Sequence, residues 1–293
     1  MADMTKTTMD VYLREVWSLT PSITYRAKAV LVPMLDHTWE PELGVGRGDT
    51  VNVSGFTQNN SPNNRGAGSG TFGTGSTITF DANTESQTQI VVNRFYYKAF
   101  RQPVEVAAQQ SPNYLPLLMA GHETAISVQI DADIAGDNTN GIDAATTVVG
   151  TDNVDITEDD LLTCQVNLNN NNAPDGDRFL VLSPASAVSV QKIEAVRNSL
   201  YGSVGSVPLN AGPGRIGRYG MFEVYMSNNL EAGTAGKKNG AFQREYCAFI
   251  EQLNLQTASD TNIEDGVFRQ YVTYNTCGFK LMKTSFLNEL DGK

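Results

Sequence analysis

The clearest pattern of apolar and polar positions lies between residues 113 and 136, NYLPLLMAGHETAISVQIDADIAG. Read with the period of an α-helix, one stripe is formed by Leu115, Leu118, Met119, His122, Ile126, Ile130 and Ile134. Most polar residues, including Asp131 and Asp133, fall on other faces, where we expect them to meet water. A Ser-Pro-Asn sequence at 111–113 offers a start and Gly136 offers a stop. We therefore predict one long amphipathic helix that packs on a core.

Before this helix the pattern changes to that of β structure. Alternating Val51 and Val53 predict a strand at 50–56, and Ile78 and Phe80 predict a second strand at 76–80. The roughly twenty residues between them are mostly Asn, Gly, Ser and Thr, a composition that is typical of functional or disordered loops. We predict a long hairpin with a flexible tip, and the β-branched and aromatic residues of 88–100 predict a further strand leading to the helix.

The second half of the chain alternates helical and strand patterns. Thr157 followed by Asp160 is a capping sequence, which predicts a helix that ends in the asparagine run at 169–172. RFLVLSP at 178–184 predicts a short strand that is buried on both faces, 185–200 a second amphipathic helix, and 221–230 another strand. This alternation indicates an α/β unit.

Residues 1–40 show no such order. Their apolar positions have no clean period, and Pro21, Pro33 and Pro41 interrupt them. We expect an arm that needs a partner surface to become ordered.

Composition and charge narrow the classes of function. The chain has 293 residues, of which 40% are hydrophobic and 18% charged, and its net charge is −11. Because no basic stripe is available to neutralise phosphates, we exclude a dedicated nucleic-acid binder and a protein that binds anionic membrane. No apolar run is long enough to span a bilayer, and the N-terminal sequence has no signal-peptide core.

The residues that usually carry chemistry are sparse. Three widely spaced cysteines, Cys164, Cys247 and Cys277, form neither a disulfide framework nor a zinc spacing, so we interpret them as buried or incidental thiols. Two histidines, His37 and His122, exclude a histidine-rich metal site. We predict no catalytic residue, no metal ligand and no cofactor.

One motif is misleading. Gly212, Gly214 and Gly217 match GxGxxG, a dinucleotide-binding fingerprint, but that site requires a strand before the glycines and a helix after them. Here a loop precedes them and a strand follows, so we reject nucleotide binding.

The order of these parts resembles the major capsid protein of tailed bacteriophages, the Hong Kong 97 phage type of shell subunit. The resemblance covers nearly the whole chain and rests on Gly48-Asp49-Thr50-Val51 at the start of the hairpin and on the long helix after FYYKAFRQPVEV. It continues through the helix led by Asp159, through RFLVLSP with its following helix, and through Gly217 to Gly220 running into FEVYMSNNL. It implies an α+β fold with an N-terminal arm, an extended β-hairpin loop, a peripheral domain with a long spine helix, and an α/β axial domain.

The resemblance also implies a division of the chain. We expect the arm at 1–45, the extended loop at 46–92, the peripheral domain at 93–155 and 244–277, and the axial domain at 156–243 and 278–293. The peripheral strands are expected near 246–255 and 267–276, joined by a polar hairpin tip at 256–266, and a returning axial strand near 278–290.

Contacts between subunits are the functional sites that we expect. The candidate residues lie on the extended loop and near the polar tip: Arg47, Arg65, Phe72, Asp260, Glu264, Asp265 and Arg269. Copies of the tip that meet around a threefold axis would bring acidic groups within a Debye length of about 8 Å. Two ways to offset their repulsion are Arg269 of a neighbour and a bound cation; the acids could also splay into water.

The function implied is that of a coat protein that self-assembles into pentamers and hexamers of an icosahedral head enclosing phage double-stranded DNA. The expected partners are other copies of the chain and scaffolding, portal and decoration proteins, and the expected location is the virion, after assembly in the bacterial cytoplasm. The alternatives are an encapsulin-type compartment shell and a phage tail-tube or fibre protein. One departure from the family is that residues 44–90 contain no lysine. The family member whose shell subunits become covalently cross-linked uses a lysine on this loop.

Overall fold

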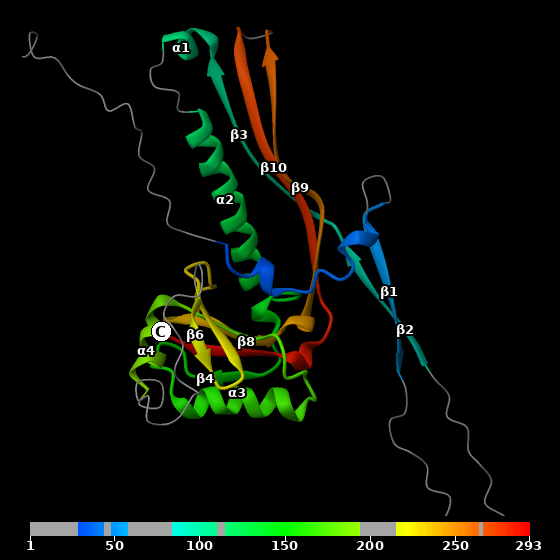
Figure 1. The fold of residues 1–293 in the computed structure, drawn as a ribbon, viewed down its shortest axis with the longest axis vertical. Helices are drawn as coiled ribbons and strands as arrows, with labels where there is room; N and C mark the ends of the chain where they lie inside the picture. Colours follow the sequence, from blue (N-terminus) through cyan, green and yellow to red (C-terminus); the bar gives the residue numbers. More distant parts are fainter. Residues whose placement is uncertain (1–28, 44–47, 58–83, 110–114, 194–214, 264–265) are drawn as a thin grey trace, which may run out of the picture.

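The computed structural model describes residues 29–43, 48–57, 84–109, 115–193, 215–263 and 266–293. It has three β-sheets and a long helix, α2, which spans Leu115–Gly136 (Figure 1). The predicted long helix is therefore confirmed, and His122, Ile126, Ile130 and Ile134 of its stripe are buried. Two positions on it were predicted wrongly: Leu118 is exposed and Asp131 is completely buried. The carboxylate of Asp131 is buried because backbone N–H groups of residues 30 and 31 bind it.

The helix α2 lies along a three-stranded antiparallel sheet. Its strands are β3 (Arg94–Pro103), β10 (Phe268–Leu281) and β9 (Cys247–Asn262), in the order β3-β10-β9. A short helix, α1 (Val104–Gln109), follows β3 at the far end of this sheet (Figure 1). The two peripheral strands expected near 246–255 and 267–276 are thus confirmed, and both extend further than predicted.

A two-stranded hairpin projects from the body beside this sheet (Figure 1). It pairs β1 (Thr50–Thr57) with β2 (Thr84–Val91), whereas the predicted strand at 76–80 lies outside the described residues. At its base, Val51, Ile90 and Val92 pack with Ala248 and Ile250 of β9 in a small separate core.

The single strand predicted at 88–100 was wrong. The chain pairs as β2 up to Val91, leaves the ladder at 92–93, and begins β3 at Arg94. The N–H of buried Val92 still donates to the carbonyl of Asp49 (2.8 Å), and the chain then leaves β1 where β10 crosses closely. A Cβ on Gly278 would lie 2.3 Å from the carbonyl oxygen of Val91, so only glycine fits at the crossing.

The lower body is built on a six-stranded mixed sheet. Its order is β4-β11-β8-β5-β7-β6, with the strands spanning Val148–Gly150, Leu287–Gly292, Lys237–Gln243, Arg178–Leu182, Phe222–Met226 and Arg215–Tyr219. The pairs β4–β11 and β5–β7 are parallel and the other neighbours antiparallel. Every residue of β5 is buried, as predicted. The C-terminal strand begins later than predicted, because 278–281 continue β10 and β11 starts at Leu287.

Two helices accompany this sheet. The predicted capping box is confirmed at α3 (Glu158–Asn170): Thr157 Oγ1 accepts from the N–H of Asp160, whose carboxylate accepts from the N–H of Thr157. The helix α4 (Pro184–Lys192) starts as predicted, and the second half of the predicted helix lies mostly outside the described residues. Leu161, Cys164 and Leu168 of α3 pack into the main core.

Residues 29–43 pack on this same chain. The segment contains two short helices, η2 (Val32–Met34) and η3 (Glu40–Glu42), and its residues Val30, Leu31, Met34 and Leu35 lie in the main core. For this part of the expected arm, therefore, no partner surface is needed. Three further short helices are η4 (Ile142–Ala144), η6 (Arg244–Tyr246) and η7 (Thr284–Phe286).

Candidate assembly site

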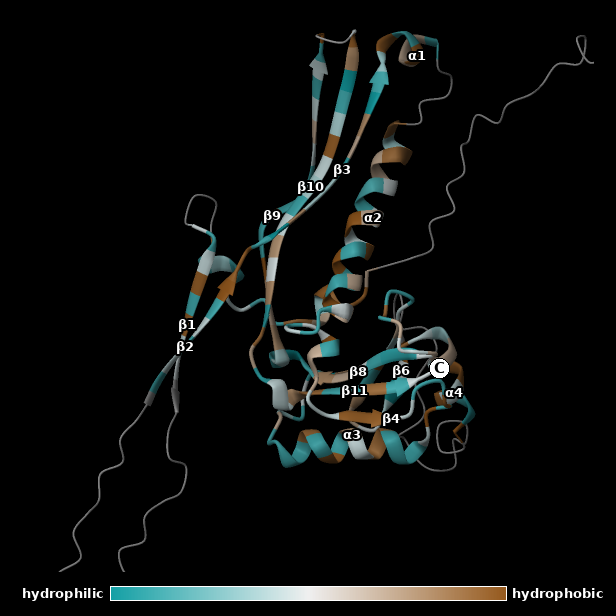
Figure 2. Ribbon diagram, turned by 180° about the vertical axis from the view of Figure 1, so that it is seen from behind, coloured by the Kyte–Doolittle hydropathy of each residue, from teal (hydrophilic) through white to brown (hydrophobic). Residues whose placement is uncertain are grey.

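The free half of the β9–β10 pair holds the two candidate contact residues that the structure describes. Asp260 on β9 pairs with Gln270, and Arg269 on β10 pairs with Thr261. Because paired residues share a face and neighbours along a strand alternate, Asp260 and Arg269 lie on opposite faces of the sheet. The predicted tip at 256–266 was therefore too long: 256–262 are strand, and Figure 2 shows these residues as mostly pale or hydrophilic.

The other candidate contact residues cannot be placed. Arg47, Arg65, Phe72, Glu264 and Asp265 all lie outside the described residues. The grouping of acids at the tip, the role of Arg269 and the cation alternative stay predictions.

An aromatic patch on the three-stranded sheet was missed by sequence reasoning. The side chains of Phe95 and Tyr97 are 59% and 67% exposed, and their rings lie 5.9 Å apart, with Tyr274 6.0 Å from Phe95. The alternate residues of β3, Arg94, Tyr96 and Phe100, contact α2, so the patch faces away from the helix. Period-two alternation within the aromatic run could have separated these two sets.

Exposed apolar side chains also gather at the free end of this sheet. Ile263 and Val267 border the turn between β9 and β10 and are 74% and 54% exposed. Val106 of α1 is exposed as well, and the N–H of Val104 donates to the carbonyl of Val267, which ties α1 to the turn. Exposed apolar residues that cluster in this way indicate a contact surface.

The described side chains of the outer hairpin are polar or glycine. Beyond Val53 the described side chains are Ser54, Gly55, Glu85, Ser86 and Gln87, and they are exposed or half-buried. A two-stranded ribbon without a packed face is marginally stable alone. Its open backbone edges and polar side chains favour contact with another protein surface.

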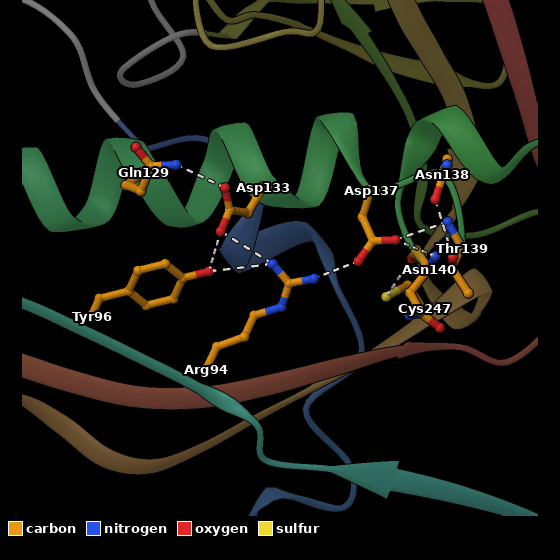
Figure 3. Close-up of polar contacts among 9 residues, drawn as sticks. All are labelled: Arg94, Tyr96, Gln129, Asp133, Asp137, Asn138, Thr139, Asn140 and Cys247. Carbon is orange, nitrogen blue, oxygen red and sulfur yellow. Dashed lines mark hydrogen bonds and ion pairs between the residues drawn. The ribbon is translucent and has the colours of Figure 1, made fainter.

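A polar network holds the long helix α2 against the sheet (Figure 3). Arg94 donates from Nη1 to Asp133 (3.1 Å) and from Nη2 to Asp137, and its guanidinium lies 4.2 Å above the ring of Phe279. Tyr96 donates its hydroxyl to the same Asp133 oxygen (2.5 Å). Burial, and then this hydrogen bond, raise the pKa of Tyr96. The network fixes the angle between α2 and β3 from one end of the helix.

Asp131 makes a second fixed point on α2. Its carboxylate accepts from the N–H of Val30 (2.5 Å) and of Leu31 (3.1 Å), and Asn229 Nδ2 lies 3.4 Å away. Burial raises the pKa of this carboxyl to about 6, against the lowering effect of those donors. One side chain therefore joins the helix, the segment 29–31, and the loop that follows β7.

A third buried carboxyl lies in the lower sheet. Glu289 is 4% exposed, and Lys238 binds both Glu289 (3.5 Å) and Asp143. Burial raises the pKa of Glu289 to about 7, partly opposed by Lys238.

We expect the stability of the free subunit to fall as pH rises from about 4 to 7. Asp131 and Glu289 both have a raised pKa when folded, so the folded chain binds more protons than the unfolded chain in this interval. Buried His122 acts oppositely, because burial and Lys98 lower its pKa. The variant Glu289→Gln isolates the contribution of Glu289. Denaturant unfolding should show that the stability of the variant relative to the wild type is higher at pH 8 than at pH 5. An equal difference at the two pH values would contradict the prediction.

The residues that the structure describes give no support for a metal site, a reactive thiol or a membrane-spanning helix. No group of three or more His, Cys, Asp or Glu side chains there is placed to hold a metal ion. The three cysteines are buried, free thiols, as predicted, and burial raises the pKa of Cys164 to about 12. In the same described residues, no helix is long and apolar enough to cross a membrane.

Comparisons with solved structures define the fold. Over 96% of its length the chain matches 98% of a chain from Mycobacterium phage Che8, with a TM-score of 0.76 and 18% identity. The capsid of cyanophage P-SCSP1u matches 98% of this chain over 94% of its own, with a TM-score of 0.70 and 13% identity. The capsid of an empty GTA particle gives 0.63 over 98% of each chain, at 10% identity. No family model matches the sequence, and no curated protein matches it. The expected α+β fold of phage capsid subunits is therefore confirmed.

Proposed function

We propose that this chain is a major coat protein that assembles into the closed icosahedral head of a tailed phage and encloses its double-stranded DNA. The observation that carries this proposal is the match of fold over nearly the whole chain to subunits of phage capsids. The proposed domains are those expected from the sequence. One detail bears on their boundary: β4, at 148–150, pairs with β11 in the lower sheet rather than with the peripheral strands.

The distribution of surface supports assembly with other copies. The outer hairpin, the aromatic patch and the apolar end of the β9–β10 pair are three surfaces without a covering element in the described residues. A subunit with several unlike surfaces makes heterologous contacts, and such contacts avoid open filaments when they close into rings and shells. Pentamers and hexamers are the rings that an icosahedral shell requires.

The acidic net charge of the chain is compatible with a shell protein that encloses DNA. A net charge of −11 does not favour binding of DNA phosphates, and a shell needs only to enclose the DNA. We accordingly assign this chain no catalytic role and place it in the virion, assembled in the bacterial cytoplasm, with scaffolding, portal and decoration proteins as further partners.

Closed particles are the expected result of expressing the chain, alone or with a scaffolding partner. Electron micrographs should show round shells, and sedimentation should show a fast boundary in place of a monomer. Tubes or fibres would favour the tail-protein alternative. Closed shells that never contain DNA during infection would favour a compartment of the encapsulin type. A stable monomer that yields no particle even in infected cells would contradict the proposal.

Mature shells should be held without covalent links between subunits. No lysine occurs in 44–90, and the three cysteines are free and buried. Particles boiled in detergent and reductant should therefore give a single band near 31.8 kDa. A ladder of multimers would show that another pair of residues forms a bond.

A further inference from the structure

A cavity of about 190 Å³ lies where three parts of the molecule meet: the segment 29–33, the helix α2, and the strands β9 and β10. Its apolar wall includes Val32, Pro33, Ile130 and Leu255, and its polar wall is formed mainly by Glu251 and Asn275. The cavity is several times larger than the volume of about 30 Å³ that one water occupies in the liquid.

The polar groups of this cavity are mainly acceptors, and one of them has no donor. Asn275 is 2% exposed, its Nδ2 donates to Glu251, and its Oδ1 is buried without a hydrogen-bond partner. The amide orientation follows from chemistry, because an ionised carboxylate can only accept. The donors beside the carboxylate are this side-chain amide and the backbone N–H of Leu255, and Asn275 Oδ1 is left without a donor.

The other charged groups nearby do not supply what is missing. His37 uses Nδ1 on Glu40 (2.9 Å) and Nε2 on the carbonyl of Val32 (2.9 Å), so neither ring nitrogen is left for Glu251. Ser127, the remaining polar residue on the wall, donates to the carbonyl of Glu123 (2.9 Å). Within the described residues no lysine or arginine forms an ion pair with Glu251. Burial raises the pKa of Glu251, opposed in part by Asn275, by His37 and by the N–H of Leu255.

We propose that this cavity binds an alkylammonium group, with the ammonium on Glu251 and the methylene chain against Val32, Ile130 and Leu255. An ammonium group brings three donors, which can serve Asn275 Oδ1, and a positive charge that can pair directly with Glu251. A short alkyl stem fits the apolar wall, as lysine stems do when they lie along apolar surface. Asn275 acts as a positioning residue because it holds the carboxylate toward the cavity. The group could be the side chain of a lysine from a second copy or a free aliphatic amine, which share this chemistry.

Putrescine is the probe for the test, with 1,4-butanediol as the uncharged match and potassium chloride to equalise ionic strength. Putrescine should raise the thermal midpoint of the free subunit in a concentration-dependent way, and the diol should not. In Glu251→Gln, which keeps an acceptor for Asn275, the apparent Kd should rise about tenfold or more, the loss expected for one charge-assisted hydrogen bond. Glu42→Gln removes an exposed acid and should bind putrescine like the wild type.

No rise in the wild type, or an equal rise in Glu251→Gln, would overturn the proposal. Neither result depends on particle formation, so the failure of this inference and the failure of the proposed function can be told apart. Measurements on assembled particles then distinguish the two sources of the ammonium group, a free amine and a lysine of a second copy. Binding that persists in particles identifies a free amine. A lysine that resists reductive methylation in wild-type particles and reacts in Glu251→Gln particles identifies a second copy.

Discussion

Replacing Asp131 by alanine should destabilise the subunit by about 2–4 kcal/mol and release residues 30 and 31 from the helix α2. The carboxylate receives the N–H groups of Val30 and Leu31 in a fully buried position. Without it, two buried donors have no acceptor, and each costs about 1–3 kcal/mol. Part of this cost is offset, because the variant no longer buries a carboxyl whose pKa is raised to about 6.

Two measurements test this result. Denaturant unfolding gives the global cost, and hydrogen exchange at the amides of Val30 and Leu31 gives the local one. Asp131→Asn is a milder variant, since its oxygen can serve one of the two donors while its NH₂ opposes the other. The order of stability should be wild type, then asparagine, then alanine. Replacement of exposed Asp159 by alanine is the control, and unchanged protection of both amides in Asp131→Ala would contradict the assignment.

The sequence was sufficient to predict the elements that depend only on local sequence patterns. The helix α2, the capping box of α3 and the all-buried strand β5 each follow from spacing or from a short motif, and all three were predicted. The break between β2 and β3 was missed because it depends on β10, whose Gly278 lies far away in the sequence. Local propensity in 88–100 contains no sign of that crossing.

Buried polar groups were the main failure at the candidate site. Helical periodicity placed Asp131 in water because a carboxylate on an apolar face is unfavourable unless it is paired. Its partners are backbone groups of residues 30 and 31, and no side-chain pattern reveals them. Arg94 stands in an aromatic run whose density predicts a strand but says nothing about the two aspartates on α2.

The interactions of Asp131 and Arg94, which fix the position of α2, are consistent with the proposed function. A shell subunit must present its hairpin, its aromatic patch and the end of its long sheet at set angles to several neighbours. Asp131 and Arg94 lie on the two sides of α2 that face the segment 29–31 and the strand β3. Because these interactions hold the surfaces in fixed orientations, less conformational entropy is lost when each contact with a neighbour forms. More of the interaction free energy of each contact is then available for assembly.

Replacing Arg94 by leucine is the second change with a large expected effect. The guanidinium bridges Asp133 and Asp137, which lie four residues apart on the helix, and it stacks on Phe279. Breaking a buried pair by removing one partner costs about 3–5 kcal/mol. The side chains here keep about a quarter of their exposure or less, at 26%, 27% and 15%, so we expect about 2–3 kcal/mol.

The comparison with an exposed pair makes this prediction decisive. Lys192 pairs with Asp155 at 3.4 Å, with side chains that are 62% and 42% exposed, so Lys192→Leu should cost much less than Arg94→Leu. Arg94→Lys keeps the charge but has one ammonium where the guanidinium reaches both aspartates, and it should fall between the two. If unfolding followed by tryptophan fluorescence shows Arg94→Leu to be no worse than Lys192→Leu, the network of Figure 3 does not set the position of α2 on the sheet.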